Sequence, residues 1–270
     1  MKTGKMVRLL RVFASTALFA SIPAFGQYAA PPLTGLVSWW RGEGNANDSA
    51  SSNTGSALNG AGYSGGAVGS GFLFDGVDDH IRIPDSPGLR LTTGFTLAAW
   101  VNPSSRGSYD EILSKWGAVF PVNHNGYTFS IHPDGRSYVA VSADGSDAGA
   151  NVFTTSTIPL NTWTHLAGSY DGSTLRIYIN GILNNETPYS GGVFPTLDDL
   201  SIGGVVGGTD VGGGISFFDG RIDEVMIYNR ALSGSEVLTL VPEPSALAIL
   251  ALGLAGMVAK SKGRRKITSN

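Results

Sequence analysis

Two Gly-containing dipeptides, Asp171-Gly172 and Asn180-Gly181, place the strongest constraint on what this chain can fold into. Both are typical of type I′ hairpin turns, in which the two central residues adopt positive φ angles. Between them, the segment Leu175–Ile179 alternates aliphatic residues with other side chains, which puts the aliphatic ones on one face of a strand. The region 162–183 is therefore predicted to be an antiparallel meander with one buried face.

Short strand-like segments recur along the chain, separated by Gly, Asn, Asp, Pro and Ser, a pattern typical of a sandwich or barrel. Phe95–Val101 is apolar on both faces and suits a central strand. A short helix is expected only at Ser233–Leu240, where Ser233 and Glu236 are spaced as in a capping box. The predicted fold class is all-β. The other expected strands are Leu36–Trp40, Gly71–Phe74, His80–Ile83, Tyr127–Ile131, Tyr138–Val141, Trp163–Tyr170, Leu200–Ile202 and Arg221–Tyr228.

Composition favours a globular domain that is held together by a hydrophobic core. The chain has 42% apolar residues and five Trp but no Cys, so its stability has to come from packing, or from a bound ion, rather than from disulfides. The formal net charge is −3 at pH 7, and no basic block lies between the two ends of the chain. Nucleic acid is therefore not an expected partner.

The first residues have the pattern of a secretory signal peptide. Basic residues between Lys2 and Arg11 precede an apolar run at 12–20, and small residues at Ala24 and Gly26 allow cleavage after Gly26. The alternative is an uncleaved N-terminal anchor, which the shortness of the apolar run disfavours. The predicted boundaries are a signal peptide at 1–26, one domain at 27–241 and a C-terminal segment at 242–270.

The C-terminal segment combines Pro242-Glu243-Pro244, an apolar run at Ala246–Ala259 and a basic end at 260–266. The apolar run is shorter than the ~20 residues that a membrane-spanning helix needs. In this order the parts resemble the PEP-CTERM sorting signal of Gram-negative bacteria. The resemblance implies an exosortase-type sorting partner, a transient tether in the inner membrane through a short hydrophobic helix, and a final place at the cell surface or in the extracellular matrix. The alternative is a plain C-terminal helix packed on its own domain.

A second resemblance covers nearly the whole region between the two targeting segments. In their order and spacing, several motifs resemble a laminin-G-like domain of the concanavalin A-like superfamily. The resemblance implies a jelly-roll sandwich of two antiparallel sheets. Members of the family bind carbohydrates, proteins or matrix, and many hold a structural calcium ion. The motifs are Gly35–Trp40, Phe74–His80, Phe95–Val101, Leu160–His165, Tyr170–Gly181 and Gly220–Leu232.

The family resemblance also implies a position for the calcium ion. In relatives, the Asp of the Ile-Asp-Glu-Val segment, here Asp223, binds calcium together with the loop after the first strand. Calcium takes six to eight oxygen ligands, and a Gly/Asn-rich loop supplies backbone carbonyls beside carboxylates. The expected ligands are Asp48 and Asp223 by their side chains, with carbonyls around Glu43 and Asn45. The alternatives are a salt bridge from Arg41 or Arg221, or an Asx turn in the loop.

A further acidic cluster is formed by Asp75, Asp78 and Asp79, which flank Gly76. Such a sequence is typical of a turn between strands. The alternative is a second ion site.

No feature of the sequence supports catalysis. Sandwich glycoside hydrolases of the superfamily carry a Glu-x-Asp-x-x-Glu strand, and hydrolysis needs two carboxyl groups roughly 5–10 Å apart across a cleft. The six Glu residues include no two within six positions of each other. A nucleophile-elbow pattern and a dinucleotide fingerprint both fall in one Gly-rich loop at 60–66, without the strand–turn–helix that each requires. The chain is therefore predicted not to be an enzyme.

Candidate binding residues come from an aromatic-rich, loop-like segment at 116–127. Sugars stack on exposed aromatic rings, and Trp116, Phe120 and Tyr127 are the expected contacts to a glycan or a surface protein. The alternative is that these rings only cover a sheet edge. The expected function is that of a non-catalytic, exported adhesion or glycan-contact module with a structural calcium ion; the runner-up is a purely structural matrix component without a specific ligand.

Overall fold

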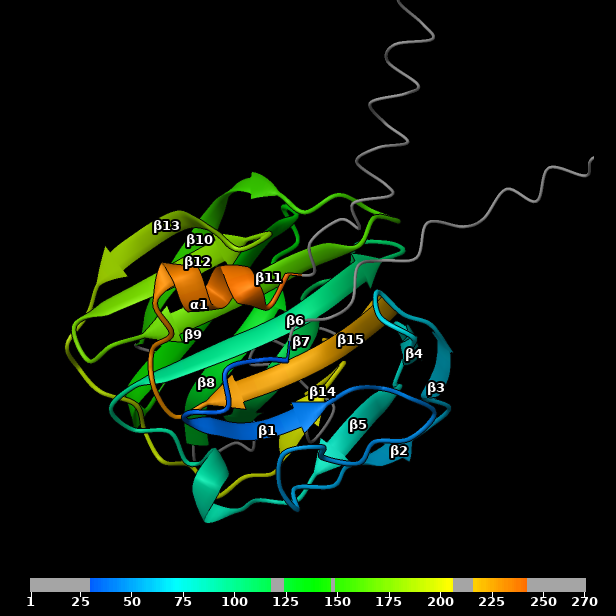
Figure 1. Cartoon of the computed structure of the whole chain (residues 1–270), viewed down its shortest axis with the longest axis horizontal. Helices are drawn as coiled ribbons and strands as arrows, with labels where there is room; N and C mark the ends of the chain where they lie inside the picture. The colour runs from blue at the N-terminus through cyan, green and yellow to red at the C-terminus, as the bar shows by residue number, and fades with distance from the viewer. Residues whose placement is uncertain (1–29, 118–123, 147–148, 206–215, 242–270) are drawn as a thin grey trace, which may run out of the picture. The chain divides into compact units, whose positions relative to one another are not determined.

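Antiparallel strands make up nearly all of the regular structure in the computed structural model, which describes residues 30–117, 124–146, 149–205 and 216–241 (Figure 1). The strands form two sheets. Among the described residues, the other regular structure is one 3-10 turn (η1, Pro87–Leu89) between two strands and one short α-helix after the last strand. The predicted all-β, two-sheet sandwich is confirmed. The predicted signal peptide and sorting segment, and Phe120, lie outside the described residues.

The first sheet has eight strands. Seven follow one path, and β1 pairs with β15 beside this path. In spatial order the path is β13 (Ile182–Pro188), β12 (Thr174–Ile179), β11 (Thr164–Tyr170), β6 (Phe95–Pro103), β15 (Asp219–Tyr228), β4 (Ser70–Asp75) and β3 (Gly62–Gly65), and β1 spans Leu36–Trp40. Every residue of β6 is buried, as expected of a central strand.

The second sheet has seven strands, all paired antiparallel. Its order is β10 (Ala150–Thr157), β9 (Arg136–Gly145), β8 (His124–Ile131), β7 (Asp110–Gly117), β14 (Leu200–Ile202), β5 (His80–Ile83) and β2 (Ser56–Leu58). Both sheets contribute alternate aliphatic and aromatic residues to one large core cluster. Because side chains alternate along a strand, the residues between these core positions lie on the outer face of each sheet.

A second, smaller core covers the outer face of the eight-stranded sheet. The helix α1 (Gly234–Thr239) lies across this sheet, and its Val237 packs with Tyr178 and Met226 (Figure 1). The predicted capping box is confirmed, because the Ser233 side chain accepts a hydrogen bond from the amide of Glu236 and the Glu236 carboxylate accepts one from the amide of Ser233. The helix thus buries the apolar residues that β12 and β15 place on that face.

The predicted meander is formed by β11, β12 and β13, but its two turns differ. Asn180 and Gly181 have φ angles of +50° and +78°, as expected for a type I′ turn. At the other turn only Gly172 has a positive φ, +91°, and the expectation for Asp171 was wrong. The Asp171 carboxylate instead accepts hydrogen bonds from the amides of Ser173 and Thr174, and so stabilises a longer loop.

A β-bulge interrupts β15 at the place that positions the candidate calcium site. Asp223 pairs with Trp100, but Met226 pairs with Ala98, so β15 carries one residue more than β6 in this stretch. Glu224 has a φ of +52°, which is uncommon for a residue other than glycine. Regular strand alternation would place Asp223 on the same face as Val225, but the extra residue puts the two side chains on opposite faces.

Candidate functional site

Asp223 lies where two strands meet end to end along β15. On the edge of β15 opposite β6, β4 pairs with residues 219–222 and β1 pairs with residues 225–228. The Asp223 side chain is fully buried. Its Oδ2 atom accepts a hydrogen bond from the Val68 amide at 2.9 Å, and its Oδ1 atom accepts one from the Glu224 amide at 2.7 Å. Burial, assisted by the neighbouring Glu224 charge, raises the pKa of Asp223 to about 8.

Glu224 is a second buried carboxyl group directly beside Asp223. Its Oε2 atom accepts a hydrogen bond from Trp39 Nε1, while its Oε1 atom has no hydrogen bond and lies 3.6 Å from Nε of Arg41. Burial raises the pKa of Glu224 to about 7. Arg41 is 42% exposed and also pairs with Glu43. The buried Glu224 and the exposed Glu43 therefore share one partly solvated guanidinium group.

The tight turn between β3 and β4 brings Glu43 to the same place. A Cβ atom on Gly66 would lie 2.4 Å from Oδ2 of Asp223, and one on Gly69 would lie 2.2 Å from Oε1 of Glu43. The Ser70 amide also donates to Oε2 of Glu43, at 3.2 Å. The carboxylates of Asp223 and Glu43 both contact the β3–β4 turn, and Glu224 follows Asp223 directly. We call Asp223, Glu224 and Glu43 the carboxylate junction.

Asp48 and Asn45 stabilise the loop after β1 rather than pointing free carboxylate or amide oxygens into an opening. The Asn45 side chain donates to the carbonyl of Glu43 and accepts from the amide of Asn47. Burial opposes the charge on Asp48, but hydrogen bonds led by the one from Ser51 outweigh it and lower its pKa. The donors to the Asp48 carboxylate are the amides of Trp39, Ala50, Ser51 and Asn53 and the hydroxyl of Ser51.

The carboxylate junction gathers oxygen donors, although its three carboxylates do not all come within 4.8 Å of one another. Asp223, Glu224 and Glu43 offer only oxygen atoms, which is the ligand type that calcium takes. Glu224 Oε1 is buried without a hydrogen bond, and a buried charge needs a partner. Of the predicted ligand residues, Asp223 and Glu43 both contact the β3–β4 turn by their side chains, whereas the side-chain oxygens of Asp48 and Asn45 accept hydrogen bonds within the loop.

Two of the three expected binding residues, Tyr127 and Trp116, lie within the described ranges, on the neighbouring strands β8 and β7. Tyr127 is 1% exposed, belongs to the core between the sheets and donates its hydroxyl hydrogen to the carbonyl of Leu89. Its ring therefore offers no face to a ligand. Trp116 is half-buried on β7, where it pairs with Asn125 of β8.

A different set of rings gathers on the outer face of the seven-stranded sheet, and we call Tyr109, His132, Tyr138 and Phe153 the aromatic platform. All four are half-buried. Tyr138 and Phe153 pair across β9 and β10 and are stacked, with ring centroids 5.0 Å apart and planes at 22°. His132 meets the edge of Tyr109 at 5.4 Å and the edge of Phe153 at 5.5 Å.

Strand alternation explains why Tyr138 and Phe153 face outward. Val139 and Val152 point into the core between the sheets, so the adjacent Tyr138 and Phe153 point to the opposite face. The sequence carries this signal, because Tyr138 alternates with buried aliphatic residues in an expected strand. The platform was nevertheless not predicted, because Phe153 lies in β10, which was not among the expected strands.

Charged groups border the aromatic platform. Arg136 lies 4.8 Å from the ring centroid of Phe153, in the geometry of a cation–π contact. Its Nε atom also donates to Asp134 Oδ2 at 2.8 Å, and Nδ1 of His132 lies 3.1 Å from Asp134 Oδ1. The ion pair with Arg136 holds the pKa of Asp134 well below its usual range. The platform thus has apolar ring faces beside a carboxylate that stays charged.

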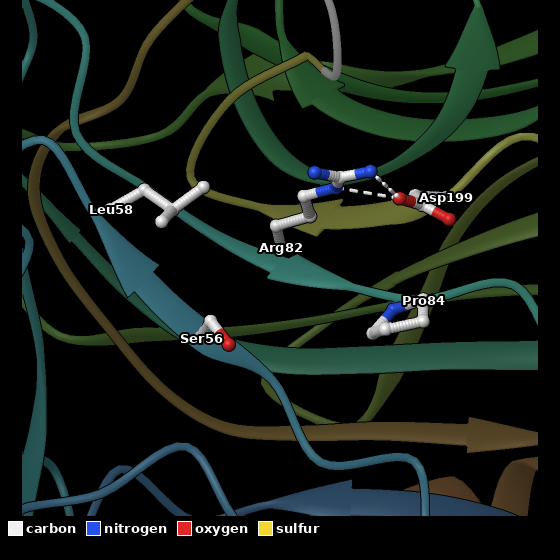
Figure 2. Close-up of a pocket in the computed structure, with 5 residues that line it drawn as sticks. All are labelled: Ser56, Leu58, Arg82, Pro84 and Asp199. Atoms are coloured by element: carbon white, nitrogen blue, oxygen red, sulfur yellow. Dashed lines mark hydrogen bonds and ion pairs between the residues drawn. The ribbon is translucent and has the colours of Figure 1, made fainter.

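A pocket of about 420 Å³ lies near the opposite edge of the same sheet. Figure 2 shows Arg82 of β5 pointing toward Asp199, and Nε of Arg82 donates to Oδ2 of Asp199 at 2.6 Å. Arg82 lies between the core residues Ile81 and Ile83, so it shares the outer face with the aromatic platform. The opposite charges of Arg82 and Asp199 balance each other in this pocket. The lining residues are Ser56, Leu58, Arg82, Pro84 and Asp199.

The fold and its motifs define a lectin-like sandwich, and comparison with known families agrees. A laminin-G model of the concanavalin A-like lectin/glucanases superfamily matches residues 75–238. The chain therefore belongs to this superfamily. The PEP-CTERM protein-sorting motif matches residues 240–265, which confirms the resemblance of the C-terminal segment. A motif of this class implies export and a surface or extracellular place in Gram-negative bacteria. None of the helices in the described residues is long and apolar enough to cross a membrane.

The similar proteins include one curated relative and two solved structures. Human usherin is 24% identical over 168 residues, which are 62% of this chain and 3% of usherin. Domain 4 of AbnA, an extracellular arabinanase from Geobacillus stearothermophilus in complex with arabinotriose, has a TM-score of 0.61 and 25% identity, over 76% of this chain and 98% of that domain. The botulinum neurotoxin serotype D ligand-binding domain, in complex with N-acetylneuraminic acid, has a TM-score of 0.55 and 12% identity, over 81% and 51% of the two chains.

Proposed function

We propose that this chain is an exported, non-catalytic module that contacts carbohydrate through the aromatic platform. The observation that carries the proposal is the pair of stacked, half-buried rings of Tyr138 and Phe153 on the face of the sheet that points away from the core. Aromatic rings contact other apolar surfaces through their faces. The C–H groups of a sugar ring present such a surface.

The charged border of the platform supports the same ligand class. Sugar hydroxyl groups both donate and accept hydrogen bonds, and a charged partner makes those bonds stronger. Asp134 would accept from a sugar hydroxyl, and Arg136 would donate to one. The bound arabinotriose of the AbnA domain provides a further argument, because that domain has the same fold over 76% of this chain.

We also propose a structural calcium ion at the carboxylate junction. Asp223 and Glu43 would be carboxylate ligands, Glu224 would add a neighbouring charge, and Asp48 and Asn45 would fix the loop whose carbonyls complete the site. Raised pKa values of about 8 for Asp223 and about 7 for Glu224 support the proposal, because they record charges that lack sufficient compensation. The ion would supply that compensation and hold β1, β4 and β15 together.

Calcium removal should therefore lower the unfolding temperature of the full chain. An ion that binds only the folded state stabilises it by about 2.7 kcal/mol at a hundredfold excess over its dissociation constant. Thermal unfolding in EDTA and then in excess calcium measures this effect. We expect a rise of several degrees in the wild type and a clearly smaller one in Asp223→Ala, whereas an equal rise in both proteins would place the ion elsewhere.

The buried carboxyl groups favour a non-catalytic role. A glycosidase needs two carboxyl groups about 5–10 Å apart on either side of an open cleft. Asp223 and Glu224 are adjacent in sequence and at most 1% exposed, and Glu111 is 5% exposed and accepts a hydrogen bond from Thr128 at 2.6 Å.

We propose exosortase-type sorting machinery as the partner of the C-terminal segment, with transient attachment to the inner membrane. A structural matrix component without a specific ligand is the alternative.

A glycan array with calcium present tests the binding proposal. We expect the wild type to bind a subset of glycans and a Tyr138→Ala, Phe153→Ala double variant to lose at least about tenfold in affinity, which is about 1.4 kcal/mol. Trp116→Ala is the matched control, because Trp116 is a half-buried ring of the same sheet outside the platform. Binding lost in the control but kept in the double variant would contradict the site. A flat array would favour the structural alternative.

A further inference from the structure

A second group of carboxylates lies in the turn between β4 and β5, apart from the carboxylate junction. Oxygen atoms of Asp75, Asp78 and Asp79 all lie within 4.8 Å of one another. Among the described residues, these are the only three or more His, Cys, Asp or Glu side chains that come together with metal-ligand spacing. Asp75 and Asp78 are exposed, whereas Asp79 is only 5% exposed.

Asp79 differs from Asp75 and Asp78, because it is buried and only one of its two carboxylate oxygens accepts a hydrogen bond. Its Oδ2 atom accepts the amide hydrogen of Asp75 at 3.1 Å, which directs the side chain into the turn. Its Oδ1 atom is buried and has no hydrogen bond. The backbone of Gly60 closes over this atom, since a Cβ on Gly60 would lie 2.8 Å from it. A buried carboxylate oxygen without a partner is costly unless a cation compensates it.

Carboxylates dominate the charge around this turn. Among the described residues, none of the ion pairs involves Asp75, Asp78 or Asp79. A fourth carboxylate is close by, because Asp219 of β15 pairs directly with Asp75 of β4. Burial raises the pKa of Asp79, and the charge of Asp75 raises it further. The turn therefore concentrates negative charge, and the neighbouring His80, which lowers the pKa of Asp79, does not outweigh burial and the charge of Asp75.

We propose that Asp75, Asp78 and Asp79 form a second binding site for a divalent cation of the calcium class. Carboxylate oxygens and water would make up the coordination shell, as is usual for hard cations. The site would also join two turns, because the Asn59 side chain donates to the carbonyl of Asp78 at 3.0 Å. The bound cation would thus fix the turn before β3 against the turn before β5.

Residue-resolved NMR of the full chain during a calcium titration tests the proposal. The amides of Gly76 and Val77 report on this turn, because the Val77 amide donates to Asp75 Oδ1, and the Val68 amide reports on the carboxylate junction. We expect the Gly76 and Val77 signals to move with a dissociation constant of about 10⁻⁴ to 10⁻³ M, as in extracellular calcium modules. An Asp75→Asn, Asp78→Asn double variant should weaken this response at least tenfold.

The controls separate this site from the carboxylate junction. Asp223→Asn should leave the response of Gly76 and Val77 to calcium unchanged. The experiment can therefore contradict the proposal for one cation site without contradicting the proposal for the other. Asp144→Asn is a matched control, because the exposed Asp144 also accepts a backbone hydrogen bond two residues on but lies outside the cluster. Signals of Gly76 and Val77 that do not move at about 10 mM calcium, or that move equally in the double variant, would overturn the proposal.

Discussion

Single residues decide where the charge of this molecule is concentrated. The bulge at Glu224, with its φ of +52°, leaves Asp223 on the outer face of the sheet, whereas Ile222 and Val225 on either side point into the core. A non-glycine residue in this conformation costs about 1–3 kcal/mol and is kept only where the surroundings impose it. Here the bulge sets two carboxyl groups side by side, both at most 1% exposed.

The raised pKa values at the carboxylate junction predict how stability depends on pH. In the folded chain the pKa of Asp223 is about 8 and that of Glu224 about 7, against ordinary values of 3.8 and 4.5. The folded state therefore holds more protons than the unfolded state between these limits. With EDTA present, we expect the free energy of unfolding to fall as the pH rises from about 4 to about 8, with a slope of at most about 1.4 kcal/mol per pH unit for each carboxyl group.

Urea unfolding at several pH values across this window measures the effect. An Asp223→Asn variant should show a shallower fall, because its side chain carries no charge at any of these pH values. Excess calcium should also flatten the profile of the wild type, since the cation replaces the protons. A wild-type stability that rises across the window, or that matches the variant at every pH, would contradict the assignment.

At the scale of elements, local signals predicted the strands and the helix well. Leu36–Trp40, His80–Ile83 and Leu200–Ile202 match β1, β5 and β14 residue for residue. The adjacent rings of Trp39 and Trp40 lie on opposite faces of β1, because Trp40 belongs to the large core while Trp39 packs against the smaller one. Alternation and capping are local properties, so the sequence contains what is needed to recognise them.

The strands that were not predicted carry polar residues whose partners are distant. In β7, Lys115 is fully buried because its ammonium group forms an ion pair with Asp85 at 2.7 Å, a contact between residues far apart in the chain. In β13, an edge strand of which the predicted meander included only the start, Asn and Glu residues hide the alternation. Such strands are stabilised by tertiary contacts rather than by their own pattern.

The β3–β4 turn gives a prediction at this scale, because its backbone fits tightly against β15. Gly66→Ala would place a Cβ atom 2.4 Å from Asp223 Oδ2. We expect a loss of about 1–3 kcal/mol in the free energy of unfolding, as for other overpacked sites. Gly65→Ala is the control, since a Cβ there meets nothing within 4 Å. Equal stability of the two variants in urea unfolding would show that the turn is not held against Asp223.

At the scale of the whole molecule, the sandwich assembles sites that the linear sequence keeps apart. The carboxylate junction combines the loop after β1, the β3–β4 turn and β15, and the family resemblance, rather than spacing, brought Asp223 and the β1 loop together in the prediction. The aromatic platform combines β9 and β10 with the residue after β8 and the residue before β7. Its position follows from the register of four segments, which composition and local patterns do not specify.

Mapping a bound oligosaccharide onto the sandwich by NMR tests the central claim most directly. The full chain, with calcium present, would be titrated with the oligosaccharide that binds best on the glycan array, and its backbone amide and aromatic ring signals followed. We predict that the signals of Tyr109, His132, Tyr138 and Phe153 shift together with one dissociation constant. Shifts centred on Trp116, or shifts in which the platform takes no part, would contradict a glycan contact at the aromatic platform.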